Sequence, residues 1–189
     1  MKPFITFIAC AHNEEFYNSP FIDSMLAQTN PNWKAIIYNN GPITDTMYTV
    51  DDPRISYERS PIDTGNWGTA NRASAIKYLV DTEYVVNTSI QDYYLPCTVQ
   101  LIADAITAGA DMIHWQAISH LFNYNVISGE IAFGHLDWGQ WTIKTEYIKQ
   151  TGIVSGEQFC SDFYTIQEII RKGLIKKSYK VDKILTIHN

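Results

Sequence analysis

The chain has 189 residues, a length that fits one folded domain with a sizeable core. Hydrophobic residues make up 46% of it and charged residues 18%, a composition that excludes an intrinsically disordered protein. The formal net charge of −6 argues against a nucleic-acid partner, because proteins that bind phosphate backbones usually present a basic patch.

The cysteines and the apolar segments bear on the compartment. Cys10, Cys97 and Cys160 are widely spaced and form no CxxC pair, so we expect reduced thiols in a reducing compartment. No apolar run is long enough to span a membrane, and residues 1–3 lead directly into a predicted strand rather than a signal peptide. We therefore expect a soluble, cytoplasmic protein with no membrane span.

Predicted strands alternate with amphipathic helices through the first two-thirds of the chain. A first helix is expected to begin with Ser19 as N-cap and Pro20 at the first helical position. Further helices are predicted around Ala73, Ile76 and Val80, over residues 96–108, and over residues 162–172 with Phe163, Ile166 and Ile170 buried. Strands are predicted over residues 4–11, 33–38, 55–57, 84–88, 111–117 and 183–187, with a turn at residues 39–42.

This alternation predicts an α/β fold with a mostly parallel, Rossmann-like sheet flanked by helices and joined by right-handed crossovers. The sequence contains no repeat, low-complexity segment or linker, so we expect a single domain over residues 1–189. The sequence does not specify an oligomeric state.

One polar turn stands out. Apolar residues 84–88 run into Ser89-Ile90-Gln91-Asp92, and Pro96 follows at an expected helix start. Ligands of open α/β sheets bind beyond the carboxyl ends of the strands, so this turn is a candidate site. By itself, Asp92 either ligates a hard cation or caps its own turn.

The order of several motifs resembles the GT-A glycosyltransferases of family 2, over nearly the whole chain. Ala11-His12-Asn13-Glu14 is similar to the end of that family's opening strand, and Asn39 stands where relatives usually carry an Asp. Ser89–Asp92 occupies the place of the family's Asp-x-Asp element. Other segments resemble its glycine-and-arginine stretch, its acceptor side and its terminal strand: Gly65, Gly68, Asn71 and Arg72; Asp137-Trp138-Gly139; Lys144-Thr145-Glu146; Ser161-Asp162; and residues 185–189 ending in His188-Asn189.

The resemblance implies an inverting transfer of a sugar from a nucleoside diphosphate donor, a UDP-sugar, to a hydroxyl of a glycan or other acceptor. Residues 1–110 would form the nucleotide-binding half, and residues 111–189 the acceptor side with a C-terminal metal strand. Asp162 would act as general base and Asp137 would hold the acceptor, while Asp92 and His188 would bind Mn²⁺ or Mg²⁺. The nucleotide would contact Ala11, His12, Asn13, Asn39, Gly65, Arg72, Ser89, Ile90 and Gln91.

The chain departs from this pattern where metal binding is concerned. Ser89 and Gln91 stand at acidic positions, so Asp92 is the only carboxylate of the turn, and fewer ligand charges weaken cation binding. A carboxylate with an imidazole suits Mn²⁺ better than Mg²⁺. Asn39 keeps a carbonyl that can accept a hydrogen bond from uracil N3–H.

Each candidate residue also has a structural interpretation. Arg72 either clamps the diphosphate or forms a surface ion pair, Asp162 can be an N-cap as well as a base, and Asp137 either fixes its own turn or holds the acceptor. His188 is either a ligand or a frayed terminal residue, and His12 is interpreted as a wall of the nucleotide pocket. Trp115, Trp138 and Trp141 are expected in the core or a pocket wall.

Two other functions stay open. A degenerate, non-catalytic relative that binds a nucleotide or glycan would explain the missing acidic residues. A nucleotidyltransferase would share the sheet and the metal, but the sequence lacks a glycine-rich phosphate loop near its first strand.

Overall fold

The computed structural model describes residues 4–11, 19–40, 49–60, 68–154 and 160–188. Within these ranges, nine strands form one sheet in the order β3-β2-β1-β4-β8-β6-β9-β5, with β7 paired to β6. The strands are β1 (Ile5–Ala11), β2 (Trp33–Asn40), β3 (Ile55–Ser60), β4 (Tyr84–Ser89), β5 (Tyr93–Tyr94), β6 (Met112–Ser119), β7 (Asn125–Ile127), β8 (Trp141–Lys144) and β9 (Ser178–His188). The helices are α1 (Pro20–Leu26), α2 (Thr69–Tyr78), α3 (Thr98–Thr107), α4 (Thr145–Thr151) and α5 (Ser161–Arg171), with 3₁₀ turns η2 (His120–Phe122) and η3 (Trp138–Gln140).

The first four strands of this order are parallel, as predicted. The chain moves outward from β1 to β2 and β3, and then returns to place β4 on the other side of β1. This reversal puts the carboxyl ends of β1 and β4 next to each other, which is where open α/β sheets bind ligands. The other half is mixed: β8 is antiparallel to both β4 and β6, whereas β9 is parallel to β6.

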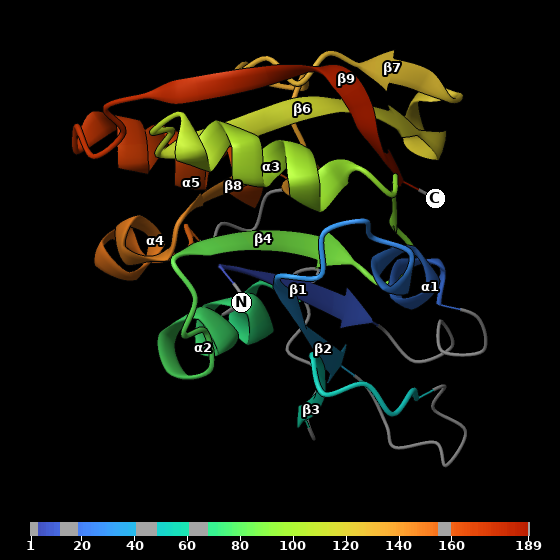
Figure 1. The fold of residues 1–189 in the computed structure, drawn as a ribbon. Coiled ribbons are helices and arrows are strands. Elements are labelled where there is room, and N and C mark those ends of the chain that lie inside the picture. Colours follow the sequence, from blue (N-terminus) through green and yellow to red (C-terminus); the bar gives the residue numbers. More distant parts are fainter. Residues whose placement is uncertain (1–3, 12–18, 41–48, 61–67, 155–159, 189) are drawn as a thin grey trace.

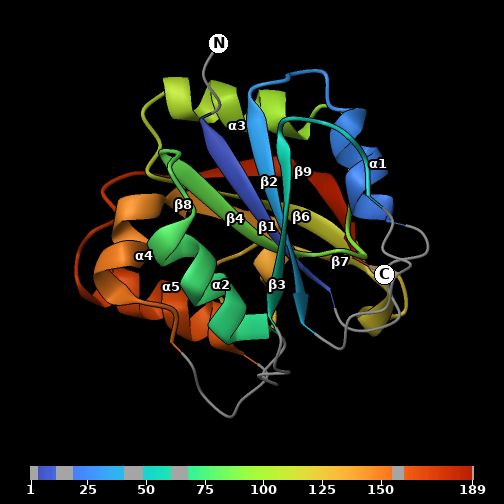
Figure 2. The same ribbon diagram turned by 90° about the horizontal axis from the view of Figure 1, so that it is seen from below.

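Helices cover both faces of the sheet (Figures 1 and 2). On one face, α1 and α3 bury Phe21, Ile22 and Val99 in one core cluster. On the other, α2, α4 and α5 bury their apolar residues against β4 and β8 in a second cluster. The predicted α/β fold with a helix-flanked sheet is therefore confirmed.

The predicted start of α1 is confirmed: Ser19 is its N-cap and Pro20 its first residue. The Ser19 hydroxyl oxygen accepts a hydrogen bond from Ile22 N–H. Elsewhere the boundaries differ. The chain at Asn39-Asn40 continues β2 rather than turning, and α3 begins at Thr98, two residues after Pro96. The strand β9 starts at residue 178 instead of 183, since its exposed polar residues hide the strand pattern.

Two predictions about α5 were wrong. The buried face contains Ile166 and Ile169, whereas Ile170 is exposed, because the polar Asp162 and Thr165 complete the inward stripe. Asp162 is also not the N-cap, since the helix begins at Ser161 with Cys160 as the cap residue.

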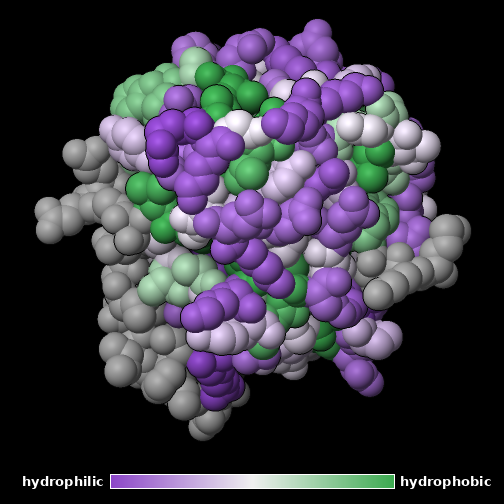
Figure 3. Space-filling model, turned by 90° about the vertical axis from the view of Figure 1, so that its left-hand side faces the viewer, coloured by the Kyte–Doolittle hydropathy of each residue, from purple (hydrophilic) through white to green (hydrophobic). Residues whose placement is uncertain are grey.

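The ends of several strands lie on one side of the molecule. The carboxyl end of β1, the end of β9 and the β6–β7 connection all lie at the right-hand side of Figure 1. The opposite side is mostly hydrophilic, with apolar residues in small separate groups (Figure 3). No helix among the described ranges is long and apolar enough to cross a membrane.

Candidate active site at the ends of β4 and β9

The turn after β4 is held closed by the side chain of Asp92. Its Oδ2 accepts hydrogen bonds from Ser89 N–H at 2.9 Å and from the Thr88 hydroxyl. The turn is also tied to β1, because Ile90 N–H donates to the Cys10 carbonyl at 3.1 Å. Asp92 is only 2% exposed. The carboxylate therefore caps its own turn, one of the two roles expected for it.

The other oxygen of Asp92 faces His188, the last residue of β9. His188 Nδ1 lies 2.5 Å from Asp92 Oδ1, and the backbone of His188 pairs with Ser119 of β6. Burial lowers the pKa of His188, but the hydrogen bond to Asp92 and the charges of Asp92 and Asp137 outweigh it and raise the pKa. His188 is thus held in place, and the interpretation as a frayed residue is wrong.

The turn η3 passes directly over Asp92. A Cβ on Gly139 would lie 2.8 Å from Asp92 Oδ2, so only glycine fits this approach. The Gly139 carbonyl accepts from Thr186 Oγ1 at 3.0 Å and lies 3.2 Å from the Tyr94 hydroxyl oxygen. A cavity of about 10 Å³, the size of one water, remains between Asp92, Asp137 and His188.

Asp137 is the N-cap of η3 and fixes its own turn, as one interpretation expected. Its Oδ1 accepts from Trp138 N–H at 2.7 Å, and Gln140 completes a capping box by accepting from Asp137 N–H at 2.9 Å. The indole of Trp138 donates to the Ser161 hydroxyl oxygen at 3.3 Å, which joins η3 to the start of α5. This contact brings Asp137 against Asp162.

The two carboxyl groups perturb each other. Burial, the negative charge of Asp137 and a hydrogen bond between the two carboxyls raise the pKa of Asp162 to about 7, although Asp162 Oδ1 accepts from Phe163 N–H at 2.6 Å. Asp162 is 8% exposed. A carboxyl with a pKa near neutrality can accept a proton from a substrate and release it at physiological pH.

The raised pKa of Asp162 predicts a stability effect that can be measured without substrate. Ionising Asp162 costs folding free energy, so the penalty is absent below pH 4 and complete above pH 7. Asp162→Asn keeps an oxygen for Phe163 N–H and can donate to Asp137. We expect this variant to be more stable by about 2–4 kcal/mol at pH 8 and by less than about 1 kcal/mol at pH 4.

Urea denaturation of the wild type and the Asp162→Asn variant at both pH values measures this difference. Asp23→Asn, on the exposed face of α1, is the control and should change neither value. A variant that is equally stable at pH 4 and pH 8 relative to wild type would contradict the raised pKa.

Three of the predicted nucleotide-binding residues, Ala11, Asn39 and Ser89, lie at neighbouring strand ends. Asn39 of β2 pairs with Ala11 of β1, and Ser89 of β4 pairs with Cys10 of β1. Asn39 is 5% exposed, and its Oδ1 has no hydrogen-bond partner among the described residues. A buried carbonyl of this kind requires a donor, which a bound base could supply.

The remaining nucleotide candidates are divided. Gln91 is half-buried at the turn. The Ile90 side chain packs in the core, and its backbone N–H and carbonyl already bond to Cys10 and Phe21 within the protein. His12, Asn13 and Gly65 lie outside the described residues.

Arg72 lies behind the end of β4. Its Nη2 donates to the Thr88 carbonyl at 2.7 Å, and its guanidinium carbon lies 6.0 Å from the Trp138 ring centroid. Arg72 is buried, so the interpretation of this residue as part of a surface ion pair is wrong. Gly68, just before α2, has a φ of 74° and approaches Cys10 too closely for any Cβ.

The tryptophans behave as expected for core and pocket wall. Trp115 and Trp141 are buried, and the half-buried Trp138 stacks on Trp141 at 5.2 Å. Sequence reasoning missed Tyr94, whose hydroxyl donates to Thr88 Oγ1 at 2.8 Å, and His120, whose ring lies 5.4 Å from that of His188. Neither stands in a recognisable motif.

The donor chemistry of Asp92 and His188 suits a divalent cation that accepts mixed oxygen and nitrogen ligands. Within the described parts of the chain, no group of three or more His, Cys, Asp or Glu side chains could hold a metal. The pair would therefore supply two ligands, and a bound phosphate or water would have to supply the others.

Comparison of whole structures identifies proteins with the same fold. TarS from S. aureus (residues 1–349) superposes with a TM-score of 0.74 at 14% identity, over 100% of this chain and 60% of TarS 1–349. Its complex with UDP-GlcNAc gives a TM-score of 0.74 at 13% identity over 99% of this chain and 58% of that one. The mannosyltransferase PcManGT from Pyrobaculum calidifontis, solved with GDP-Man and Mn²⁺, gives a TM-score of 0.70 at 11% identity over 100% and 57%.

These likenesses show that the chain has the fold expected from its resemblance to glycosyltransferases. It spans roughly three-fifths of the length of these neighbours. No family model matches the sequence, and no curated protein matches it.

Proposed function

We propose that this protein is an inverting glycosyltransferase that moves a sugar from a nucleoside diphosphate, UDP in the first instance, to an acceptor hydroxyl. The observation that carries the proposal is the position of Asp137. It borders the small cavity beside Asp92 and His188 on one side and perturbs Asp162 on the other. Four candidate residues from distant segments therefore form one continuous group.

On the acceptor side, Asp162 takes the proton of the attacking hydroxyl. The new bond forms between the acceptor oxygen and the anomeric carbon, while the bond from that carbon to the phosphate oxygen breaks and the nucleoside diphosphate departs. Burial and the negative charge of Asp137 keep the pKa of Asp162 close to neutrality, so that Asp162 can accept the proton. No covalent intermediate on the enzyme is required.

On the donor side, Asn39 Oδ1 accepts from the base, and Arg72 stands next to Thr88 at the end of β4, where a diphosphate would lie. Asp92 and His188 would hold a divalent cation, Mn²⁺ by donor chemistry, which when bound supplies positive charge against the departing diphosphate. Residues 1–110 would bind the donor, and residues 111–189 would bind the acceptor and supply the metal strand.

A second candidate is a relative that binds a nucleotide or glycan without turnover. It is favoured by one observation: both Asp92 oxygens already accept hydrogen bonds within the protein. Such a carboxylate serves the fold whether or not it ligates a metal.

Nucleotide binding is tested by thermal shift with UDP, dTDP, GDP and CDP, each with and without Mn²⁺. UDP should give the largest shift in melting temperature. A ligand present at a hundredfold its Kd stabilises the folded state by about 2.7 kcal/mol, which is readily measured. We expect dTDP to rank next, since thymine keeps the N3–H that Asn39 would bind, and CDP to rank last, since cytosine lacks it. Absence of any shift at millimolar UDP, with and without metal, would refute the donor assignment.

A further inference from the structure

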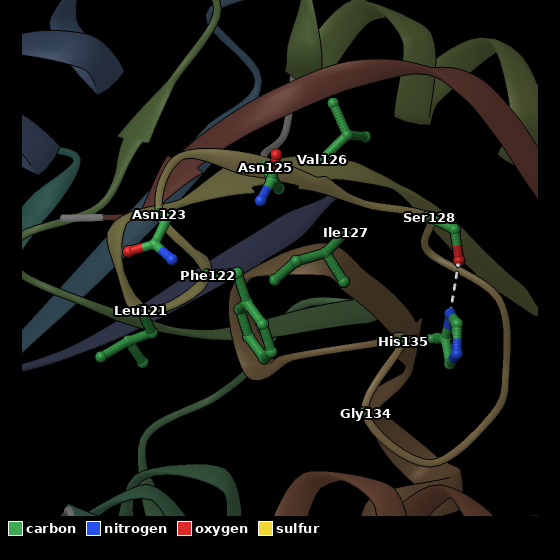
Figure 4. A pocket seen from close by; sticks show the side chains of 9 residues that line it. All are labelled: Leu121, Phe122, Asn123, Asn125, Val126, Ile127, Ser128, Gly134 and His135. Atoms are coloured by element: carbon green, nitrogen blue, oxygen red, sulfur yellow. Dashed lines mark hydrogen bonds between the residues drawn. The ribbon is translucent and has the colours of Figure 1, made fainter.

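A second, larger cavity lies beside the site, under the connection between β6 and β7. We call it the hairpin pocket; its volume is about 470 Å³, within the range of small-molecule sites. Its walls are the turn that contains Leu121 and Phe122, the strand β7, and the following loop at Gly134 and His135 (Figure 4). The Phe122 and Ile127 side chains point into the space that these three segments surround.

The lining of the hairpin pocket contains none of the strongly charged residue types. None of its nine residues is Asp, Glu, Lys or Arg, although the chain as a whole has a formal net charge of −6. Phe122 and Leu121 offer exposed apolar surface, and Asn123 and Asn125 offer amide donors and acceptors. A sugar matches this lining, because its C–H faces pack on apolar groups and its hydroxyls pair with amides.

The turn that forms one wall is unusually shaped for its sequence. Asn123 and Tyr124 have φ angles of 53° and 59°, a left-handed conformation that non-glycine residues seldom adopt. Two bonds stabilise the turn, because Asn123 N–H donates to the His120 carbonyl and Tyr124 N–H to the Ser119 carbonyl. Phe122 is therefore presented at the surface by a tightly bonded turn.

The hairpin pocket adjoins the candidate active site. Ile127 lines both the hairpin pocket and the small cavity next to Asp92 and His188. The other wall leads into Asp137, two residues after His135. In the same loop, the Phe133 ring packs on Phe163 of α5 at 5.6 Å, directly after Asp162. A ligand in the hairpin pocket would adjoin the carboxyl pair.

We propose that the hairpin pocket binds the acceptor, and that the acceptor is an uncharged glycan. This inference rests on the proposed function, since only a transferase has an acceptor. Binding of the glycan itself needs neither donor nor turnover. Phe122 packs on one sugar face, and the amides of Asn123 and Asn125 pair with its hydroxyls. The hydroxyl to be glycosylated then points toward Asp137 and Asp162.

Saturation-transfer NMR on the full chain without nucleotide tests the proposal. The probes are chitotriose, mannotriose and maltotriose, with sialyllactose as the anionic comparison. At least one neutral trisaccharide should bind, and Phe122→Ala should weaken it by about tenfold or more, as truncation of a central aromatic contact usually does. Tyr78→Ala, an exposed aromatic on α2, is the matched control and should leave binding unchanged.

Failure of the two proposals can be told apart. If a neutral glycan binds through Phe122 while UDP produces no thermal shift, the glycan-binding role of the hairpin pocket is supported and the proposed transferase function is refuted. UDP binding with none of the neutral trisaccharides bound at 10 mM (a concentration on the order of weak millimolar affinities) would refute the pocket. Tighter binding of sialyllactose, or equal binding by the Phe122→Ala variant, would overturn the proposal as well. Phe122 is 47% exposed, so its truncation should not impair folding.

Discussion

Replacing Asp162 by asparagine should lower sugar transfer by about 10²- to 10⁴-fold and leave UDP affinity nearly unchanged. Asparagine preserves the shape of the side chain and its hydrogen bond from Phe163 N–H, but it cannot accept the acceptor proton. Because Asp162 lies in α5 beside Asp137 rather than at the strand ends of Ala11 and Asn39, the substitution should not alter nucleotide binding. Release of UDP from UDP-sugars with added acceptor measures the rate.

The pH profile gives a second readout. Asp162 has a pKa of about 7 and must be ionised to act, so transfer by the wild type should rise as the pH increases through 7. The residual activity of Asp162→Asn should lack this rise. Asp23→Asn, which is remote and exposed, should match the wild type throughout. Equal rates for wild type and Asp162→Asn would exclude Asp162 as the base and favour Asp137, or Glu157, which lies outside the described residues.

Replacing Asp92 by alanine should remove the metal dependence of UDP binding. Loss of groups that only orient metal ligands typically costs about 10- to 100-fold in metal affinity, so loss of a ligand should cost more than about 100-fold. The substitution also leaves Ser89 N–H, the Thr88 hydroxyl and His188 without their acceptor, which should reduce stability by about 1–3 kcal/mol for each buried group. Calorimetric titration of UDP with and without Mn²⁺ measures the first effect.

A matched variant distinguishes loss of metal binding from loss of stability. Thr88→Val removes one of the hydrogen bonds to Asp92 and keeps its charge, so it should destabilise the protein but preserve the manganese dependence. Gln91→Asp should strengthen that dependence by adding a carboxylate to the turn, and removal of residues 188–189 should weaken it. If Asp92→Ala binds UDP with unchanged manganese dependence, Asp92 is only the cap of its turn.

Features governed by neighbours in sequence could be predicted well. The Ser19-Pro20 start of α1, the strand β1 and the polar turn after β4 all follow from local patterns, and all are present. The four-residue strand β8 could not be predicted in this way, because aromatic residues around Trp138 and Trp141 show no clear periodicity. It nevertheless determines how the second half of the sheet joins the first.

The prediction of the candidate-site residues depended on the resemblance to glycosyltransferases rather than on local sequence patterns. Asp92 and His188 are separated by 96 residues, and nothing in either segment alone predicts their contact. The need for glycine at Gly139 arises only when η3 covers Asp92, and the pKa of Asp162 rises only when Asp137 is brought beside it. The Asp92–His188 contact, the need for glycine at Gly139 and the raised pKa of Asp162 all result from packing between distant segments.

The contact between Asp92 and His188 has a consequence for the order of folding. The strands β1, β2 and β4 pair with one another without β9, whereas His188 is positioned by the pairing of β9 with β6 and β5, so we expect His188 to reach Asp92 only after β9 has paired. Such long-range pairing is entropically costly and slow to form. The site would therefore be among the last parts of the molecule to appear, and a ligand held there should slow hydrogen exchange along β9 more than along β1.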